Sequence, residues 1–333
     1  MQVKNSGNKS RSFKFELKKI SFQKMRRVLL GRGRNSEEKG WIPKLAILMI
    51  LVILGFVFLL PIIFMISTSF KSLQDLLNSQ VGYIPSTIKW SNYSTAFKVL
   101  DYWKTFGQNL MVAALPTFAQ VLICSIIGYG LAIYDFKGKR ILFSLILATF
   151  IIPSQITVIP QYILFFKLGL LGSIFSTIFP ALLGQGLNSA IFILIFYQGF
   201  RTLPHVLLEA ARLDGAGEFQ IFRTIGIPSA SQSFLISFLF SFVWYWNETF
   251  LASLFFGNGL TTLPLQLQQF DNSFSQMFPA GANPVASSSG LLGNNEAISM
   301  AATLLTIFPL LIMYFIAQKW FVESVERSGI AGE

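Results

Sequence analysis

Six long blocks of apolar residues, separated by polar segments, dominate the sequence. Each block is close to the roughly 20 residues that an α-helix needs to cross the hydrocarbon core of a bilayer. Inside a bilayer every backbone N–H and C=O group must be bonded internally, so the blocks predict helices. The spans are expected at about 45–66, 108–134, 141–166, 174–199, 232–256 and 297–318. The pattern therefore predicts an all-α integral membrane protein with six transmembrane helices.

Lysine and arginine are distributed unevenly between the segments that join the spans. With the N-terminus inside the cell, the inner segments carry 21 of these residues and the outer segments carry 5. Basic residues accumulate on the cytoplasmic side of membrane proteins, so both termini are predicted to be cytoplasmic. The chain then divides into a basic arm over 1–44, a six-helix domain over 45–318 and a cytoplasmic tail over 319–333.

The arm over 1–44 holds 13 of the 26 Lys and Arg residues of the chain. A basic arm of this size could bind RNA or anionic lipid headgroups. Because it lies directly before a span, we interpret it as a segment that enforces orientation, and we expect no nucleic-acid partner. It lacks the form of a signal peptide, because the next apolar run is long enough to span and no small-residue cleavage site follows.

Composition argues against chemistry carried out by the chain itself. Cysteine and histidine occur once each, as Cys124 and His205, so a Cys or His metal cluster is excluded and a Ser-His-Asp triad is disfavoured. A Gly-rich phosphate loop ending in Lys-Ser or Lys-Thr is also absent. We therefore expect no catalytic residue, no metal and no cofactor in this chain.

An inner loop over 200–231 joins the fourth and fifth spans and is longer than a connector needs. Its sequence predicts a short helix, a glycine turn and a second short helix. Thr202 is expected to cap the first helix, and Gly215 to end it with a positive φ. The second helix is expected to have an apolar face formed by Phe219, Phe222 and Ile225.

The same loop carries a motif: Glu-Ala-Ala, three residues, Gly, nine residues and then Ile-x-Ile-Pro. This order resembles the EAA loop of ATP-binding-cassette (ABC) importer permeases, with Ile227 where that family usually has Leu. The longer form from Glu209 to Ala216 is similar to the carbohydrate-uptake branch, of the maltose/oligosaccharide type. The resemblance covers about 41–332. From the residues alone, an ordinary surface helix with a solvated Glu209–Arg212 pair remains an alternative.

The resemblance implies the type I ABC importer permease fold in a bacterial-type plasma (inner) membrane. It also implies that the loop is a coupling helix, which docks in a groove of a cytoplasmic ATPase dimer that holds ATP and Mg. The other implied partners are a second permease subunit, an extracytoplasmic solute-binding protein and a sugar or oligosaccharide. The implied ATPase-coupling residues are Glu209, Ala210, Ala211, Asp214, Gly215, Ile225 and Pro228.

Polar residues at mid-depth in spans three to five are candidates for the translocation path, because lipid cannot satisfy them. Neutral amides beside aromatic rings suit hydroxyl-rich ligands. The candidates are Gln155, Gln185, Asn188, Trp244, Trp246, Asn247 and Glu248. Hydrogen bonding between helices is the alternative for any one of them. By resemblance, the outer loop over 257–296 is expected to contact the solute-binding protein.

Other classes of function fit the sequence less well. An ABC permease for a non-sugar solute would share the inner loop. An ion-coupled secondary transporter would usually need a buried carboxylate relay, for which Glu248 is the one candidate, and no internal repeat is visible. A membrane enzyme would need a metal or nucleophile site, and the chain offers few residues from which to build one.

Overall fold

The computed structural model describes residues 41–279 and 294–330, and every regular element in these two ranges is a helix. The chain forms two compact units, Met1–Ser67 and Thr68–Glu333. Most of the predicted basic arm, part of the outer loop and the end of the tail lie outside the described residues.

Helix α2 (Trp41–Ser69) supplies the described part of the first unit and ends just inside the second. No Asp, Glu, Lys or Arg occurs between Leu45 and Ser69. A helix that is apolar on all sides suits a hydrocarbon environment. The predicted first span over 45–66 is therefore a helix, extended by a few residues at each end.

In the second unit α5 (Tyr102–Ile133), α9 (Ser189–Arg201) and α13 (Ser231–Asn247) pack together. Small residues let their backbones approach. A Cβ atom added at Gly128 of α5 would lie 2.5 Å from the Cβ atom of Phe196 on α9. A Cβ atom added at Gly199 of α9 would lie 2.2 Å from the Oγ atom of Ser233 on α13. Such contacts are typical of helix crossings in membranes, where close packing replaces the hydrophobic driving force.

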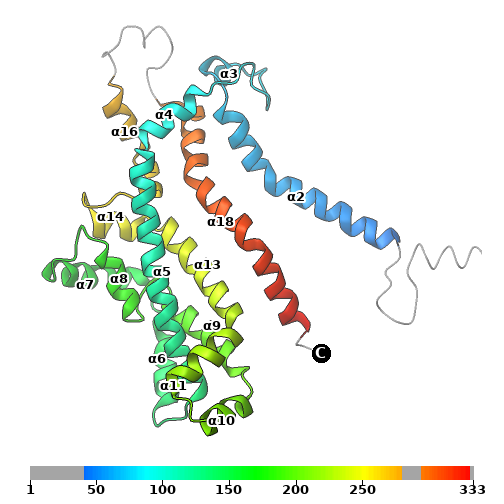
Figure 1. Cartoon of the computed structure of the whole chain (residues 1–333). Helices are drawn as coiled ribbons and strands as arrows, with labels where there is room; N and C mark the ends of the chain where they lie inside the picture. The colour runs from blue at the N-terminus through cyan, green and yellow to red at the C-terminus, as the bar shows by residue number, and fades with distance from the viewer. Residues whose placement is uncertain (1–40, 280–293, 331–333) are drawn as a thin grey trace, which may run out of the picture. The chain divides into compact units, whose positions relative to one another are not determined.

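The two ends of α5 carry different structures (Figure 1). Near its beginning lie α3 (Leu73–Leu77), α4 (Ser91–Val99), α15 (Leu263–Gln268) and α16 (Phe270–Met277). The last helix, α18 (Glu296–Ile330), packs on α4 and also touches α13. At the other end of α5 lie α10 (His205–Leu213) and α11 (Glu218–Ile221). The inner loop and the described parts of the outer loop are therefore at opposite ends of this unit.

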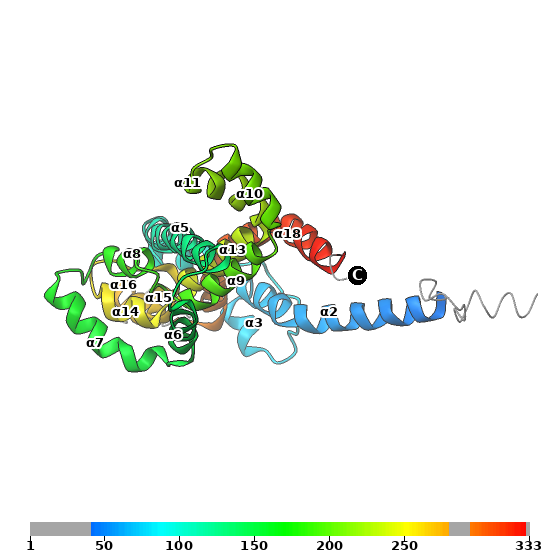
Figure 2. The same ribbon diagram turned by 90° about the horizontal axis from the view of Figure 1, so that it is seen from below.

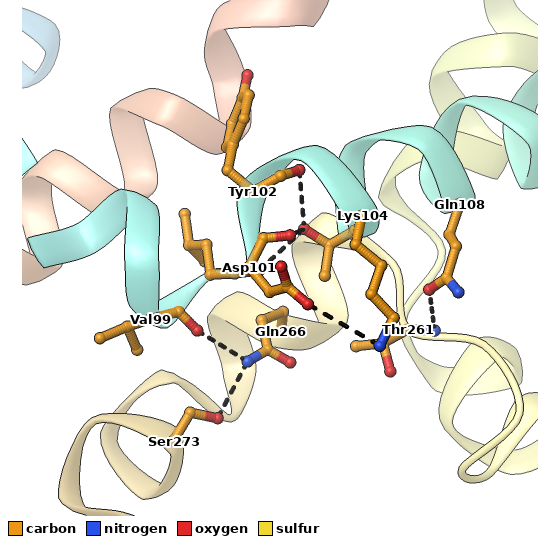
Figure 3. A network of polar contacts seen from close by, with 10 residues as sticks. Val99, Asp101, Tyr102, Lys104, Gln108, Thr261, Gln266 and Ser273 are labelled. Carbon is orange, nitrogen blue, oxygen red and sulfur yellow. Dashed lines mark hydrogen bonds and ion pairs between the residues drawn. The ribbon is translucent and has the colours of Figure 1, made fainter. Parts of the chain in front are cut away.

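A polar network fastens the outer loop to the corner between α4 and α5 (Figure 3). The Nε2 atom of Gln266 donates to the carbonyl of Val99 and to the Oγ atom of Ser273, at 3.1 Å each. The backbone N–H of Thr261 donates to Oε1 of Gln108 at 3.0 Å. Asp101 forms the corner itself in the left-handed region, with φ of 46°. The residues on both sides of the helix corner thus hold the base of the outer loop.

The number of spans agrees with the prediction, but the continuity of three of them does not. Ile42–Ser69, Tyr102–Ile133 and Glu296–Lys319 are each long and apolar enough to cross a membrane. Three bent pairs of shorter helices raise the number to six if each pair counts as one span. They are Lys139–Ile151 with Gln155–Lys167 (98°), Ser189–Arg201 with His205–Leu213 (76°) and Glu218–Ser229 with Ser231–Asn247 (78°). The predictions of continuous helices over 141–166, 174–199 and 232–256 are wrong, because the helices break between 151 and 154, between 182 and 189, and between 247 and 250.

Each break has a local cause. The third span divides into α6 (Lys139–Ile151) and α7 (Ser154–Lys167), because Pro153 has no N–H group and Ile152 before it is extended. The fourth divides into α8 (Phe175–Leu182) and α9, with Gly184 and Asn188 in the left-handed region between them. The fifth divides after α13, where Glu248 is extended before α14 (Phe250–Phe256).

Candidate functional site: an exposed elbow and a polar cavity

The elbow, residues 202–229, begins differently from the prediction. The Oγ1 atom of Thr202 donates to the carbonyl of Gly199 at 2.7 Å, so it closes α9 rather than capping α10. Extended Pro204 precedes α10 instead. Gly215 has a φ of +83°, which confirms its predicted role at the end of α10. Asp214 also lies at that end, whereas Gly217 precedes the second helix.

The second arm of the elbow does not have the predicted apolar face. Phe219 is 74% exposed, Phe222 is 7% exposed and Ile225 is half-buried, while Ile221 is fully buried. Phe219 lies in the first turn of α11 and faces away from the bundle, and a π-helical turn over Phe222–Gly226, between α11 and α12 (Ile227–Ser229), separates Phe222 from Ile225. A π turn adds a residue to the helical repeat, so positions three apart no longer share one face.

Charged and phenolic groups join the two arms of the elbow to α5. The Nε atom of Arg212 donates to Oε1 of Glu218 at 2.9 Å, so Arg212 pairs across the turn and not with Glu209, the partner that the alternative of an ordinary surface helix gave it. The hydroxyl of Tyr134, just after α5, donates to Oε2 of Glu218. Hydrogen bonds from Arg212 and Tyr134 hold the pKa of Glu218 below its ordinary value. Burial, together with the bond to Glu218, raises the pKa of Tyr134 to about 12.

The elbow has one face packed on the bundle and one face exposed. Leu208 and Ile221 are buried, and the ring of Phe222 lies 5.1 Å from that of Tyr129 on α5. Figure 2 shows α10 and α11 extending beyond the packed helices α5, α9 and α13. Large apolar side chains on the exposed face are Val206, Leu213 and Phe219, at 73%, 88% and 74% exposure. An exposed apolar patch outside the spans is typical of a protein-binding surface.

Most predicted coupling residues lie on this elbow and are accessible. Glu209, Ala210 and Asp214 are exposed, and Ala211 is half-buried. Pro228 is exposed in α12, on the side of the elbow that returns to the bundle. The fold therefore places the whole motif in one protruding segment at one end of the second unit.

A cavity of about 850 Å³ lies among α6, α7, α8, α9, α13 and α14. Four predicted path residues line it: Gln155, Gln185, Asn188 and Glu248. They come from the three breaks in spans three, four and five. Non-helical backbone at membrane depth is tolerated where it lines a cavity or is covered by protein. The breaks and the polar lining are thus parts of one arrangement.

Three predicted path residues do not line this cavity. Trp246 is 1% exposed and stacks on Phe242 in the core, with ring centroids 5.7 Å apart. Trp244 packs against Phe192, with ring centroids 5.2 Å apart. The Nδ2 atom of Asn247 donates to the carbonyl of Val243 on its own helix at 2.9 Å. Successive helical residues point about 100° apart, so this run cannot face a single cavity.

Glu248 lies at the break between α13 and α14. Its Oε1 atom accepts a hydrogen bond from the backbone N–H of Leu251 at 2.8 Å. The carboxylate thus satisfies a free donor at the start of α14, where negative charge also suits the helix dipole. This position explains how a half-buried acid is accommodated in a predicted span.

Two buried residues that bond to the break of the fourth span were missed in the sequence, and of these Tyr245 also lines the cavity. Gln120 is fully buried in α5, and Tyr245 is 3% exposed in α13. Both contact the break of the fourth span through hydrogen bonds. A lone Gln within an apolar span is a signal for such a role, but its partner cannot be identified without the tertiary structure.

Comparisons with known proteins identify the family of this chain. Residues 110–327 match the family described as binding-protein-dependent transport system inner membrane component. The arabinooligosaccharides transport system permease protein AraQ of Halalkalibacterium halodurans is 29% identical, over 84% of this chain and 93% of the relative. The diacetylchitobiose uptake system permease protein NgcG of Streptomyces coelicolor is 26% identical, over 84% and 86%.

A solved structure supports the fold. It is the crystal structure of a bacterial ABC transporter involved in the import of the acidic polysaccharide alginate. One of its chains superposes with a TM-score of 0.67 at 24% identity, covering 84% of this chain and 96% of that chain. The chain therefore belongs to the family of binding-protein-dependent transport system inner membrane components, as a multi-pass, non-enzymatic permease subunit of the ABC type.

Proposed function

We propose that this chain is a permease subunit of an ATP-driven importer of sugars or oligosaccharides, and that it forms half of the translocation path. Relatives named for arabinooligosaccharide and diacetylchitobiose uptake support the substrate class. The cavity supports it as well, because amide side chains of Gln155, Gln185 and Asn188 can donate to and accept from hydroxyl groups.

The exposed apolar face of the elbow is the observation that carries the coupling part of the proposal. Val206, Leu213 and Phe219 form an anchor for the groove of a separate ATPase subunit. The buried face, through Phe222 against Tyr129, connects that anchor to α5. Movement of the ATPase would then be transmitted to the bundle as movement of a packed element. Alternating access follows if the cavity opens to opposite sides as the bundle moves.

The remaining partners follow from the same arrangement. A second permease subunit completes the path, two ATP-binding subunits with ATP and Mg supply the energy, and an extracytoplasmic solute-binding protein delivers the substrate. The outer loop over 257–296 is the contact for that protein, because the network around Gln266 fastens the loop's base to the opposite end of α5 from the elbow. Glu209, Ala210, Ala211, Asp214, Gly215, Ile225 and Pro228 act in coupling.

Crosslinking tests the coupling proposal directly. A cysteine at Ala210 or Ala211, paired with a cysteine in the groove of the co-purified ATPase, is expected to form a disulfide whose yield changes with ATP. A cysteine at Lys137, an exposed residue between α5 and α6 and outside the elbow, is the control and is expected to give no ATP-dependent product. Absence of an ATPase from the purified membrane complex would refute the coupling role.

Transport by the reconstituted complex tests the activity. Uptake of a labelled arabinooligosaccharide, or of another member of a panel of neutral oligosaccharides, is expected to require ATP and to persist when ion gradients are dissipated. Uptake that follows an ion gradient and ignores ATP would identify a secondary transporter instead. ATP-dependent uptake of a non-sugar solute alone would leave the coupling intact and overturn the substrate class.

A further inference from the structure

A closed triangle of hydrogen bonds holds the break of the fourth span. The Nε2 atom of Gln120 donates to the carbonyl of Leu187 at 2.7 Å. The N–H of Leu187 donates to the hydroxyl of Tyr245 at 3.1 Å, and that hydroxyl donates to Oε1 of Gln120 at 2.7 Å. Both backbone groups of Leu187 are therefore satisfied by side chains, one from α5 and one from α13.

The segment that this triangle holds, residues 183–188, has a backbone of unusual shape. Gly184 and Asn188 both have positive φ, at +70° and +53°. Gly186 faces the triangle directly, because an added Cβ atom would lie 2.3 Å from Oε1 of Gln120 and 2.5 Å from the hydroxyl of Tyr245. The segment is therefore pressed against its two anchors, with no room for a side chain between them.

The same segment supplies polar groups to the cavity. Gln185 and Asn188 line the cavity and are exposed, whereas Gln120 is fully buried behind them. The direction of the two exposed amides depends on the path of the backbone from Gly184 to Asn188. Backbone hydrogen bonds secure both ends of the segment, from the N–H of Gln185 to the carbonyl of Pro180 and from the N–H of Ser189 to the carbonyl of Gly186. Between them both backbone groups of Leu187 are bonded to side chains, so these side chains help to determine the path of the segment.

We infer that Gln120 and Tyr245 are positioning residues, which set the break of the fourth span so that Gln185 and Asn188 face the substrate. This inference rests on the proposed role of the cavity as the translocation path. Gln120 acts only through the backbone of Leu187, since it does not line the cavity. Buried polar networks that are fully satisfied favour one arrangement over its alternatives, which is the property a binding segment needs.

The chain offers a matched control on the same two helices. The hydroxyl of Ser241 on α13 donates to Oγ1 of Thr117 on α5 at 3.2 Å. Both residues are fully buried, as Gln120 is, and each lies about one turn before its counterpart in the triangle. Ser241→Ala thus removes a buried hydrogen bond between α5 and α13 without touching the break.

Cysteine accessibility measures the position of the segment without any need for transport. Cys124 is the one native cysteine and has 0% exposure, so labelling of a cysteine at Gln185 or Asn188 is read over a low background. In the full complex, Gln120→Met and Tyr245→Phe are each expected to change the labelling rate by a cationic methanethiosulfonate at least fivefold. Ser241→Ala is expected to change it less than twofold.

Transport kinetics provide the second measurement. For a substrate of the wild-type complex, Gln120→Met and Tyr245→Phe are expected to raise KM at least fivefold, with the amount of assembled complex unchanged. The double variant is expected to be no worse than the more severe single variant, because either change breaks the same triangle. Failure of the wild type to take up sugar would refute the proposed function, whereas the labelling test would still apply to the triangle.

Two results would overturn the inference. Labelling rates within twofold of wild type in both variants would show that the segment keeps its position without the triangle. Loss of assembly in both variants, with Ser241→Ala intact, would make the triangle a requirement for folding rather than for substrate position.

Discussion

Replacing Gly128 by Ala is expected to destabilise the bundle, whereas replacing Gly130 is not. Both glycines lie in α5, two residues apart and therefore on different faces. An added Cβ atom at Gly128 would lie 2.5 Å from the Cβ atom of Phe196 and 2.9 Å from the backbone N of Tyr197, both on α9. Ordinary van der Waals contact begins at 3.4 Å, so the two backbones must separate by most of an ångström. At Gly130 nothing lies within 4 Å.

The magnitude follows from two opposing terms. Overpacking of a well-packed contact costs about 1–3 kcal/mol. Movement of a flexible side chain cannot relieve the contact at Gly128, because one of the close atoms is the backbone N of Tyr197. Alanine gains about 0.5–1 kcal/mol over glycine inside a helix. The net expectation for Gly128→Ala is a loss on the order of 1–2 kcal/mol, and for Gly130→Ala no loss or a small gain.

Thermal unfolding of the purified complex in detergent measures the difference. At about 2–4 °C per kcal/mol, Gly128→Ala is expected to lower the Tm by roughly 2–8 °C. Gly130→Ala serves as the control for helix propensity and for handling of the variants. Equal Tm shifts for the two variants, or a larger loss at Gly130, would refute the close approach of α5 and α9 on which the reasoning depends.

Three further predictions concern the elbow. Phe222→Ala removes a buried ring packed on Tyr129 and is expected to lower the Tm of the complex, at a cost of about 3 kcal/mol, and to reduce uptake. Phe219→Ala removes an exposed ring and is expected to leave the Tm unchanged while reducing co-purification of the ATPase; the opposite pattern would reverse the two faces. Glu218→Gln at neutral pH is expected to speed tryptic cleavage after Arg212, because the bond that joins the two arms is weakened. Protection that persists in the Gln variant would contradict this. Since the pKa of Glu218 is lowered in the folded chain, its bond to Arg212 is expected to be fully formed above the ordinary pKa of about 4.3 and to be lost as the pH falls through the lowered value, which an NMR titration of the Glu218 carboxyl group would follow.

The number of spans and the place of the elbow could be predicted because both depend on local patterns. A bilayer requires long apolar runs, and the EAA motif occupies consecutive residues of one loop. The turn at Gly215 was also predictable, since positive φ strongly favours glycine. The faces of the elbow were not predictable, because the apolar spacing does not reveal which side of α11 packs on the bundle, nor the π turn over Phe222–Gly226 that follows.

Some of the path residues could likewise be identified from the sequence, and others could not. Gln155, Gln185, Asn188 and Glu248 were found because polar groups at membrane depth need a cavity or a partner. Composition cannot show whether a polar or aromatic residue in a span faces a cavity or another helix. For that reason Trp246, which belongs to the core, was predicted to line the path.

Hydropathy and motif spacing are properties of short stretches, so reading the chain residue by residue was enough to predict that it crosses a membrane, how its charges are distributed and that it carries the coupling motif. The positions at which the three broken spans bend, and the side chains that hold the breaks, follow from packing between distant parts of the chain. Gln120, Leu187 and Tyr245 are far apart in the sequence, and their hydrogen bonds exist only once three helices have packed together.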